Sequence, residues 1–201
     1  MIRRAVSAAE DPVLRARLLA RLLHPYWRHR LGAFGEGSMI HRPRWVRGGH
    51  KMEIGRDTLI YHHVWLSVER EAWERPGPAL VIGSGTWIRP SVTIAAAESV
   101  VIGDRVGIGG HCFVTDLDHT MAAADKPTFH QPINSDPVRI GDGTWVGDLC
   151  AILRGSRIGE RCVIGSGSVV KGEIPDGSVA VGAPARVIGR AEDLVPRQAA
   201  A

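Results

Sequence analysis

The chain has 201 residues, of which 44% are hydrophobic and 23% charged, and a formal net charge of +4, which indicates one folded domain. No stretch approaches the roughly 18 apolar residues of a membrane span, and the N-terminus lacks the apolar core of a signal peptide. We therefore expect a cytoplasmic protein. Arginine is not interleaved with exposed aromatics in any recognisable module, which argues against nucleic-acid binding.

Residues 1–35 form an N-terminal segment with a basic, helical pattern. Residues 1–31 hold seven arginines against Glu10 and Asp11, and Asp11-Pro12 has the side chains typical of a helix start. Apolar residues then recur at helical spacing, namely Val13, Leu14, Leu18, Leu19, Leu22 and Leu23. We expect this face to pack on the rest of the protein or on a neighbouring subunit. The alternative is peripheral contact with an anionic membrane surface through residues 11–31.

Residues 36–190 repeat an aliphatic side chain at every sixth position. The clearest run is Ile140, Val146, Ile152, Ile158, Ile164 and Val170. Earlier sets of three have the same spacing: Ile54, Ile60 and Leu66; Ile82, Ile88 and Ile94; Ile102, Ile108 and Val114. A period of six fits neither a helix nor a flat strand and indicates a stacked repeat. Because three such hexads make one turn of a triangular coil, we predict an all-β, left-handed parallel β-helix of about five coils, followed by a tail at 191–201.

A second inward position is expected four residues after each aliphatic one, where only small or β-branched side chains fit. The residues that obey this rule are Thr58, Val64, Thr86, Val92, Val106, Cys112, Thr144, Cys150, Ser156, Cys162 and Ser168. All three cysteines therefore behave as buried packing residues, with no disulfide framework or paired metal motif, and a reducing compartment fits them best. Glu98 breaks the rule, so we expect an irregular coil near residues 95–99.

Two interruptions break the repeat. Residues 69–79 contain Glu71, Trp73, Glu74 and two prolines and are expected to form an extruded loop. Residues 115–139 form a second, longer loop, which we predict to lack periodic structure. A long loop inside a compact repeat is usually functional.

His119 is the best candidate for chemistry because it follows the last hexad before the long loop directly. Asp116 and Asp118 are close enough in sequence to orient its imidazole. A histidine held by an acceptor on one nitrogen keeps the other nitrogen free to act as a base. Competing histidines with weaker placement are His111, His130, His62 and His63. For His130, a place over the same site competes with a solvated position in the loop, which a lone loop histidine favours.

Four motifs occur in order in the second half of the chain: Ile140-Gly-Asp-Gly-Thr-Trp-Val-Gly147, Gly155-Ser-Arg-Ile-Gly-Glu160, Val163-Ile-Gly-Ser-Gly-Ser-Val-Val170 and Val181-Gly-Ala-Pro-Ala-Arg-Val-Ile188. Together with the loop histidine they resemble the hexapeptide-repeat acyltransferases. More narrowly, the chain is similar to the sugar O-acetyltransferases of the galactoside, maltose, nodulation-factor and exopolysaccharide type. The resemblance extends from about Ile82 to Arg190 and is absent from the first 40 residues.

The resemblance implies a homotrimer that binds acetyl-CoA between neighbouring prisms and needs no metal. His119 matches the family's catalytic base, which takes a proton from an acceptor hydroxyl, and the backbone N–H of Asp148 matches the oxyanion donor. Trp145 matches a tryptophan beside the pantetheine arm and the acceptor. The residues that the same pattern places along the cofactor are Gly147, Ser166, Lys171, Arg186 and Arg190, where cationic side chains would meet phosphates.

Departures from the family pattern leave the acceptor open. Ser91 stands where galactoside-type enzymes have an acceptor-binding asparagine, and Lys171 is shifted by one position from the family lysine. The run Asp116-Leu-Asp-His119 is closer to the polysaccharide-modifying branch. A glycan or glycolipid precursor is therefore the expected acceptor, bound in part by Ser91, Trp145 and His130.

Three other functions are compatible with the repeat. The first is N-acetylation of an amino sugar, or acylation of another small acceptor. The second is a γ-type carbonic anhydrase, which needs three zinc histidines, two of them five residues apart; His24 and His29 have that spacing but lie in the helical segment. The third is a non-catalytic trimeric scaffold, which would not need a histidine at the mouth of a long loop.

Overall fold

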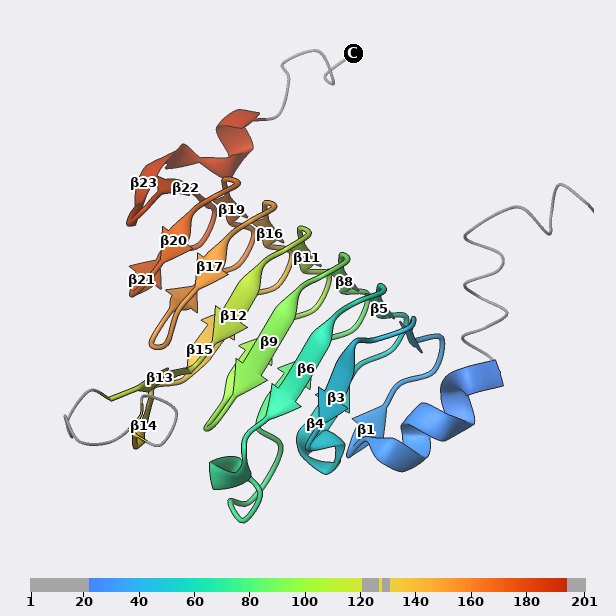
Figure 1. Cartoon of the computed structure of the whole chain (residues 1–201). Helices are drawn as coiled ribbons and strands as arrows, with labels where there is room; N and C mark the ends of the chain where they lie inside the picture. The colour runs from blue at the N-terminus through green and yellow to red at the C-terminus, as the bar shows by residue number, and fades with distance from the viewer. Residues whose placement is uncertain (1–21, 121–126, 128–130, 195–201) are drawn as a thin grey trace, which may run out of the picture.

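The chain winds into a three-sided prism of stacked coils, which confirms the predicted parallel β-helix (Figure 1). This computed structural model describes residues 22–120, 127 and 131–194. Each coil adds one short strand to each of three sheets, which we call faces A, B and C in the order in which the chain meets them. Within the coils, strands pair in parallel with the coils above and below, and Ile102 pairs with both Ile82 and Ile140.

The strands of the three faces are short, as expected for hexads that turn a corner every six residues. Face A consists of β1 Ala33–Phe34, β4 Met52–Ile54, β7 Leu80–Ile82, β10 Val100–Ile102, β15 Val138–Ile140, β18 Arg157–Ile158 and β21 Glu173–Ile174. Face B consists of β2 Met39–Ile40, β5 Leu59–Ile60, β8 Trp87–Ile88, β11 Gly107–Ile108, β16 Trp145–Val146, β19 Val163–Ile164, β22 Ser178–Gly182 and the antiparallel β23 Ala185–Arg190. Face C consists of β3 Trp45–Arg47, β6 Trp65–Val68, β9 Thr93–Ala96, β12 Phe113–Thr115, β17 Ala151–Ile152 and β20 Val169–Val170.

The described chain has six complete coils, because face C holds six strands, one per coil. This is one coil more than the predicted five. The additional coil is the first, in which Phe34, Ile40 and Val46 occupy the inward positions and are also six residues apart. An aromatic residue at the first of these positions hides the aliphatic repeat. Ile174 and Ala180 continue the ladder into an incomplete seventh coil.

The inward residues form the core, and the second inward positions are buried as predicted. Their hydroxyl and thiol groups donate hydrogen bonds to backbone carbonyls of the adjacent coil. Thr144 donates to the Gly159 carbonyl at 2.8 Å, and Cys112 donates to the Gly147 carbonyl at 3.0 Å. Buried carbonyls at the corners need such donors, which explains why serine, threonine and cysteine alternate with valine there.

In the part of the chain that the structure describes, three short 3₁₀ helices and one α-helix lie outside the prism walls. The 3₁₀ helices are η1 Gly49–Lys51, η2 Arg70–Ala72 and η4 Ala191–Leu194. The α-helix, residues 22–30, lies at the N-terminal end of the prism (Figure 1), where Trp27 and the following Leu31 are buried. Leu22 and Leu23 are exposed, so the leucine face that we expected to pack is open at this end. The predicted helix start at Asp11 lies outside the described residues. No helix in the described ranges is long and apolar enough to cross a membrane.

Candidate functional site

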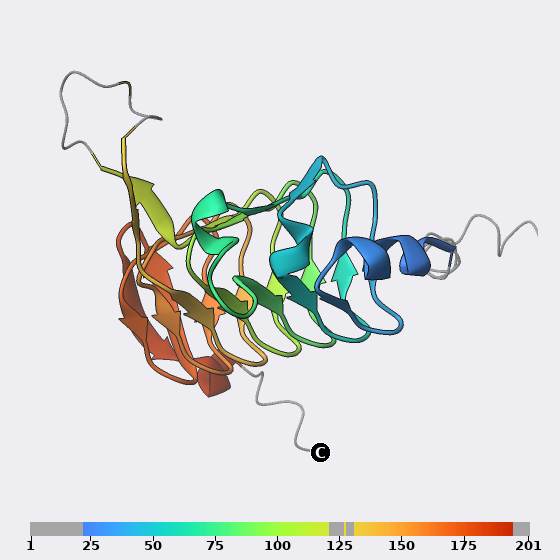
Figure 2. The ribbon, with the colours of Figure 1, turned by 90° about the horizontal axis from the view of Figure 1, so that it is seen from below.

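His119 lies on a hairpin that projects from the prism (Figure 2). The chain leaves face C after β12, at the edge between faces C and A, and forms β13 Leu117–His119. This strand pairs in antiparallel register with β14 Ile133–Ser135, so that His119 is opposite Ile133. The long loop therefore contains a hairpin where we predicted no periodic structure, since two three-residue strands are too short to leave a pattern. His119 is exposed, and His130 lies outside the described residues.

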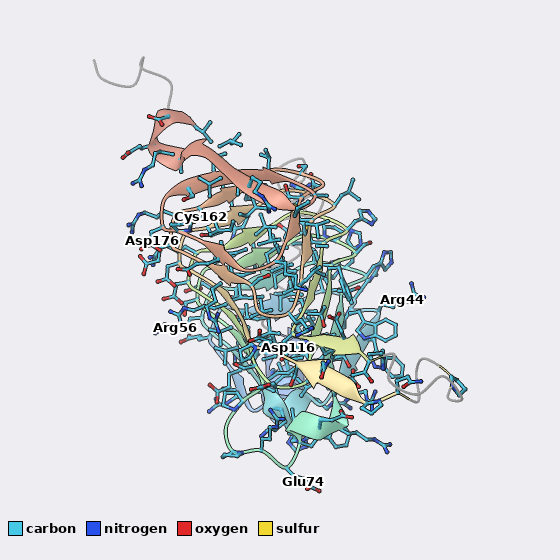
Figure 3. The ribbon with its side chains drawn as sticks, turned by 90° about the vertical axis from the view of Figure 1, so that its left-hand side faces the viewer. Arg44, Arg56, Glu74, Asp116, Cys162 and Asp176 are labelled. Atoms are coloured by element: carbon cyan, nitrogen blue, oxygen red, sulfur yellow. The ribbon has the colours of Figure 1, made fainter. Side chains whose placement is uncertain are left out.

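Asp116 supports the base of this hairpin from inside the wall (Figure 3). Its fully buried carboxylate accepts hydrogen bonds from the backbone N–H groups of Ala97 at 2.7 Å, Glu98 at 2.8 Å and Ser99 at 2.6 Å. Burial raises the pKa of Asp116, and the three N–H donors oppose that shift. Both carboxylate oxygens are thus bonded to the irregular coil predicted at residues 95–99. This differs from the expected role of orienting His119.

Asp118 holds the hairpin to the next coil. Its Oδ2 is 2.5 Å from the Nε of Arg154, which follows β17 at the same edge of the prism. A second link comes from Glu98, which accepts a hydrogen bond from the hydroxyl of Ser135 at 2.7 Å and pairs with Arg75 at 3.7 Å. The two interruptions of the repeat are therefore joined to each other and to the prism. Among the described residues, neither carboxylate of the Asp-Leu-Asp-His run is hydrogen-bonded to the imidazole of His119.

Asp148 lies at a different edge, between faces B and C. It follows β16, and its carboxylate accepts a hydrogen bond from the N–H of Gly110 at 2.5 Å while its carbonyl accepts one from Gly167 at 2.9 Å. Within the described ranges its own N–H has no backbone or side-chain acceptor. The same edge carries Gly147, Ser166 and Ser91. Trp145 is exposed on face B, and its ring covers Gly107, where an added Cβ would lie 2.4 Å from Cε3 of the indole.

One copy of the chain does not bring His119 and Asp148 together. Asp148 precedes the strands of face C, whereas His119 follows them, so the face is between the two residues. The four steps from Cys112 to Asp116 cross this face, a distance of about 13 Å at roughly 3.3 Å per residue. Figure 1 shows the hairpin and the end of β16 on opposite sides of the molecule. The candidate base and the candidate oxyanion donor are separated in each copy.

The remaining candidate cofactor residues do not form one cluster. Lys171 is exposed after β20, at the edge between faces C and A. Arg186 and Arg190 are exposed on β23, where Arg190 pairs with Glu192 at 3.4 Å. Only Trp145, Gly147 and Ser166 lie near Asp148, on adjacent coils. Across residues 22–120, 127 and 131–194, no group of three histidine, cysteine or acidic side chains is placed to hold a metal ion.

A groove of about 670 Å³ opens at the edge between faces B and C. Its lining residues are Arg44, His63, Trp65, Ser91, Thr93 and His111. Ser91 is a predicted acceptor residue and His63 and His111 are predicted competitors of His119, but no pattern in the sequence connects the three. The groove brings them together because they occupy equivalent corner positions of successive coils.

Comparison with known proteins gives the chain a family. Residues 137–172 match the model of the bacterial transferase hexapeptide, with six repeats. The galactoside O-acetyltransferase of Escherichia coli K12 is 30% identical over 155 residues, which are 72% of this chain and 73% of that protein. The chain belongs to the hexapeptide-repeat acetyltransferases.

Other similar proteins differ in length and in the molecules with which they were solved. A protein of Mycobacterium tuberculosis named "Probable acetyltransferase" is 39% identical over 145 residues, 72% of this chain, but the chain spans only 42% of that protein. An N-acyltransferase of Bacillus cereus, solved with dTDP and 3-hydroxybutyryl-CoA, has a TM-score of 0.69 at 18% identity over 83% of this chain and 87% of that one. A galactoside acetyltransferase solved with coenzyme A has a TM-score of 0.57 at 22% identity over 90% and 82%. These structures share the left-handed β-helix.

The ion pair between Arg154 and Asp118 makes a local prediction for this hexapeptide-repeat protein. Arg154→Ala is expected to lower the free energy of unfolding by less than about 1 kcal/mol, because the two side chains are 28% and 52% exposed. The hairpin should nevertheless open more often, with amide hydrogens of β13 and β14 exchanging up to about fivefold faster, the limit that a loss of about 1 kcal/mol sets. Hydrogen-exchange mass spectrometry measures this. Arg105→Ala, which removes a distant pair with Asp142, is the control and should leave hairpin exchange unchanged. Equal exchange in both variants would contradict the role of Arg154.

Proposed function

We propose that the protein is an acetyl-CoA-dependent O-acetyltransferase that modifies a hydroxyl of a sugar or glycan precursor. The observation that carries this proposal is the placement of His119. It is an exposed imidazole on a hairpin that three separate contacts hold to the prism, through Asp116, Asp118 and Glu98. A rigidly placed base with an open side is what general base catalysis on an incoming acceptor requires.

The proposed reaction is a direct transfer. The imidazole of His119 removes the proton from the acceptor hydroxyl, and the oxygen attacks the thioester carbonyl of acetyl-CoA. The backbone N–H of Asp148 donates a hydrogen bond to the oxyanion of the tetrahedral intermediate. When the carbon–sulfur bond breaks, the imidazolium returns its proton to the sulfur, so the products are the acetyl ester and coenzyme A. Trp145, beside the oxyanion donor, supplies an exposed ring surface for the pantetheine arm or the acceptor.

We also propose that the active unit is a homotrimer. His119 and Asp148 lie on opposite sides of face C, so a complete site needs the hairpin of one copy against the edge between faces B and C of another. Three large exposed side chains on faces B and C, which are Trp87, Phe113 and Leu149, fit burial at such a contact. Sedimentation velocity tests the assembly, and an active monomer would contradict a site shared between copies.

We further infer a cytoplasmic location, with peripheral membrane contact through the N-terminal helix. Leu22 and Leu23 are exposed on the described part of that helix, next to exposed Arg28 and Arg30. Apolar side chains beside cationic ones favour an anionic membrane surface. Co-sedimentation with anionic vesicles tests this contact, and unchanged binding after deletion of residues 1–31 would remove it from the proposal.

The deciding experiment follows thiol release from acetyl-CoA in the presence of a panel of sugars, amino sugars and glycan precursors. The expected result is release that depends on a hydroxyl acceptor, with a product heavier by one acetyl group. Mild alkaline hydroxylamine should remove that group, because it cleaves esters and leaves amides intact. A product that resists hydroxylamine would establish N-acetylation instead. No acceptor-dependent release with any panel member would favour the scaffold function.

A further inference from the structure

Arg44, His63 and His111 surround the groove between faces B and C with nitrogen donors. The hydroxyls of Ser91 and Thr93 and the indole of Trp65 complete the lining, and no carboxylate is among these residues. The guanidinium of Arg44, with imidazole N–H and hydroxyl donors beside it and no carboxylate, matches the several acceptor oxygens of a phosphate. The groove thus has the chemistry of an anion site.

The repeat itself places these donors in one column. His63, Ser91 and His111 occupy equivalent corners of three successive coils, each with a positive φ, at 60°, 62° and 58°. Each corner N–H donates to a carbonyl of the preceding coil: His63 to Arg42, Ser91 to His62 and His111 to Pro90, at 3.0 to 3.2 Å. Their side chains therefore leave the wall in the same direction, at steps of about 4.8 Å per coil. His63 and His111 are about 10 Å apart along the column, enough to enclose one or two phosphate groups.

Four coils of this edge carry no acidic residue, and the nearest carboxylate on it is that of Asp148, one coil beyond His111, which accepts the N–H of Gly110. No aspartate or glutamate occurs in 40–47, 60–66, 88–94 or 108–114, the segments that form the edge in four coils. Within the described chain, Arg42, Arg44 and Arg89 form no salt bridge. The pKa of His41 is lowered by burial and then by the nearby charges of Arg42 and His62. A local positive potential of this kind attracts an anionic ligand.

The edge between faces A and B offers a comparison for the charge of the groove edge, because it also carries arginines at its corners. At the edge between faces A and B, Arg56, Arg105 and Arg161 take similar corner positions, and each has a carboxylate partner: Glu36, Asp142 and Glu160 at 3.6, 4.0 and 3.2 Å. Figure 3 shows Arg44 and Arg56 on the two opposite edges. Corner arginines are paired with acids at the edge between faces A and B and unpaired at the edge between faces B and C. The unpaired charge is therefore a property of the groove edge and not a consequence of the repeat.

The groove continues along the edge that carries the proposed oxyanion donor. The N–H of Gly110, next to His111, donates to Asp148, and the N–H of Leu149 donates to Gly110 at 2.9 Å. His111 is one coil from Asp148 and His63 is three, so the groove lies roughly 5 to 14 Å from the point of transfer. This separation is about the length of one sugar ring and its linkage. An acceptor with its hydroxyl at Asp148 would place a group on the far side of the sugar in the groove.

We propose that the groove binds a phosphate or diphosphate group of the acceptor, so that the substrate is a phosphorylated or diphosphate-linked sugar. This inference rests on the proposed O-acetyl transfer and assigns its acceptor class. The exposed rings of Trp65 and Trp45, with centroids 5.8 Å apart, flank the phosphate position and offer surfaces to the group attached beyond it. That group is a nucleoside or a lipid, since both carry sugars through a diphosphate.

The test measures binding and needs no acetyl transfer. Calorimetric titration with inorganic diphosphate, dTDP, UDP and a short-chain prenyl diphosphate is expected to show binding, and Arg44→Gln combined with His111→Asn should weaken it at least tenfold. That change corresponds to one lost charge-assisted hydrogen bond at about 1.5 to 3 kcal/mol. Arg105→Gln, at the opposite edge, is the matched control and should change the Kd less than twofold. Tighter binding of dTDP or UDP identifies a nucleotide-linked acceptor, and tighter binding of the prenyl diphosphate identifies a lipid-linked one.

Three results would overturn the inference. One is the absence of diphosphate binding at 10 mM ligand. A Kd of 10 mM corresponds to a binding free energy of only about 2.7 kcal/mol, so even weak binding would be detected. Another is equal weakening in Arg105→Gln, which would indicate nonspecific charge attraction. The third is an affinity for glucuronate equal to that for diphosphate, which would show that the groove does not distinguish a phosphate from a carboxylate. If diphosphate binds and no acetyl group is transferred, the phosphate site stands, and the proposed function fails together with the acceptor class built on it. If uncharged sugars are acetylated equally well by the Arg44→Gln, His111→Asn variant and no phosphate binds, the function stands alone.

Discussion

Replacement of His119 by alanine is expected to lower kcat for acetyl transfer by about 10²- to 10⁴-fold, the usual contribution of a positioned general base. The side chain is exposed on β13 and makes no hydrogen bond to another described residue, so its loss should not change the melting temperature. The KM for acetyl-CoA should also change little, because the imidazole acts on the acceptor. Steady-state thiol-release kinetics with the acceptor found by the panel provide the measurement.

His29→Ala is a suitable control for this experiment. His29 is an exposed histidine on the N-terminal helix, far along the prism from the hairpin, and its removal should leave kcat within twofold. A His119→Ala protein as active as the parent would eliminate the mechanism proposed above. Equal loss of activity in both variants would point to a general effect of histidine removal on preparation or assembly.

Replacement of Asp116 by alanine is expected to destabilise the fold by about 3 kcal/mol or more. The carboxylate is fully buried and accepts three backbone N–H bonds, and its removal leaves three donors without partners at about 1 to 3 kcal/mol each. For a domain of this size the melting temperature should fall by roughly 10 °C. Chemical denaturation followed by circular dichroism measures the loss.

Asp118→Ala separates the two carboxylates of the Asp-Leu-Asp-His run. Its partly exposed pair with Arg154 should contribute less than about 1 kcal/mol to stability. The loss of stability in Asp116→Asn should fall between those of Asp116→Ala and Asp118→Ala. The amide keeps one oxygen acceptor but turns its NH₂ group toward the remaining backbone donors. If Asp116→Ala were as stable as the parent but inactive, Asp116 would act on His119 rather than on the wall of the prism.

The prism could be predicted from sequence because its rule is local and repeated. Within each run between Ile54 and Val170 the inward residues are six apart, so an interruption between runs does not hide the pattern. The first coil was missed for the opposite reason: Phe34 replaces the expected aliphatic residue, and too few hexads follow it to restore the pattern. The position of His119 at the exit from the repeat also followed from spacing alone.

The contacts of the candidate site could not be predicted, because they connect residues far apart in sequence through the third dimension. Asp116 is next to His119 in the chain, yet its carboxylate bonds to residues 97–99 on the neighbouring coil. Arg154 reaches Asp118 from 36 residues away. Arg44 and Trp65 carried no motif at all, and their relation to His111 appears only when coils are stacked in register.

Stacking also means that the number of coils between the proposed phosphate site and the proposed transfer point fixes the distance between them. His63, Ser91, His111 and Asp148 mark consecutive coils along a single edge, and each coil adds about 4.8 Å. The protein would then select its acceptor by the distance between the phosphate group and the reacting hydroxyl, in steps of one coil. A relative that inserted or deleted an 18-residue turn between these marks would select an acceptor longer or shorter by that same unit, with its chemistry unchanged.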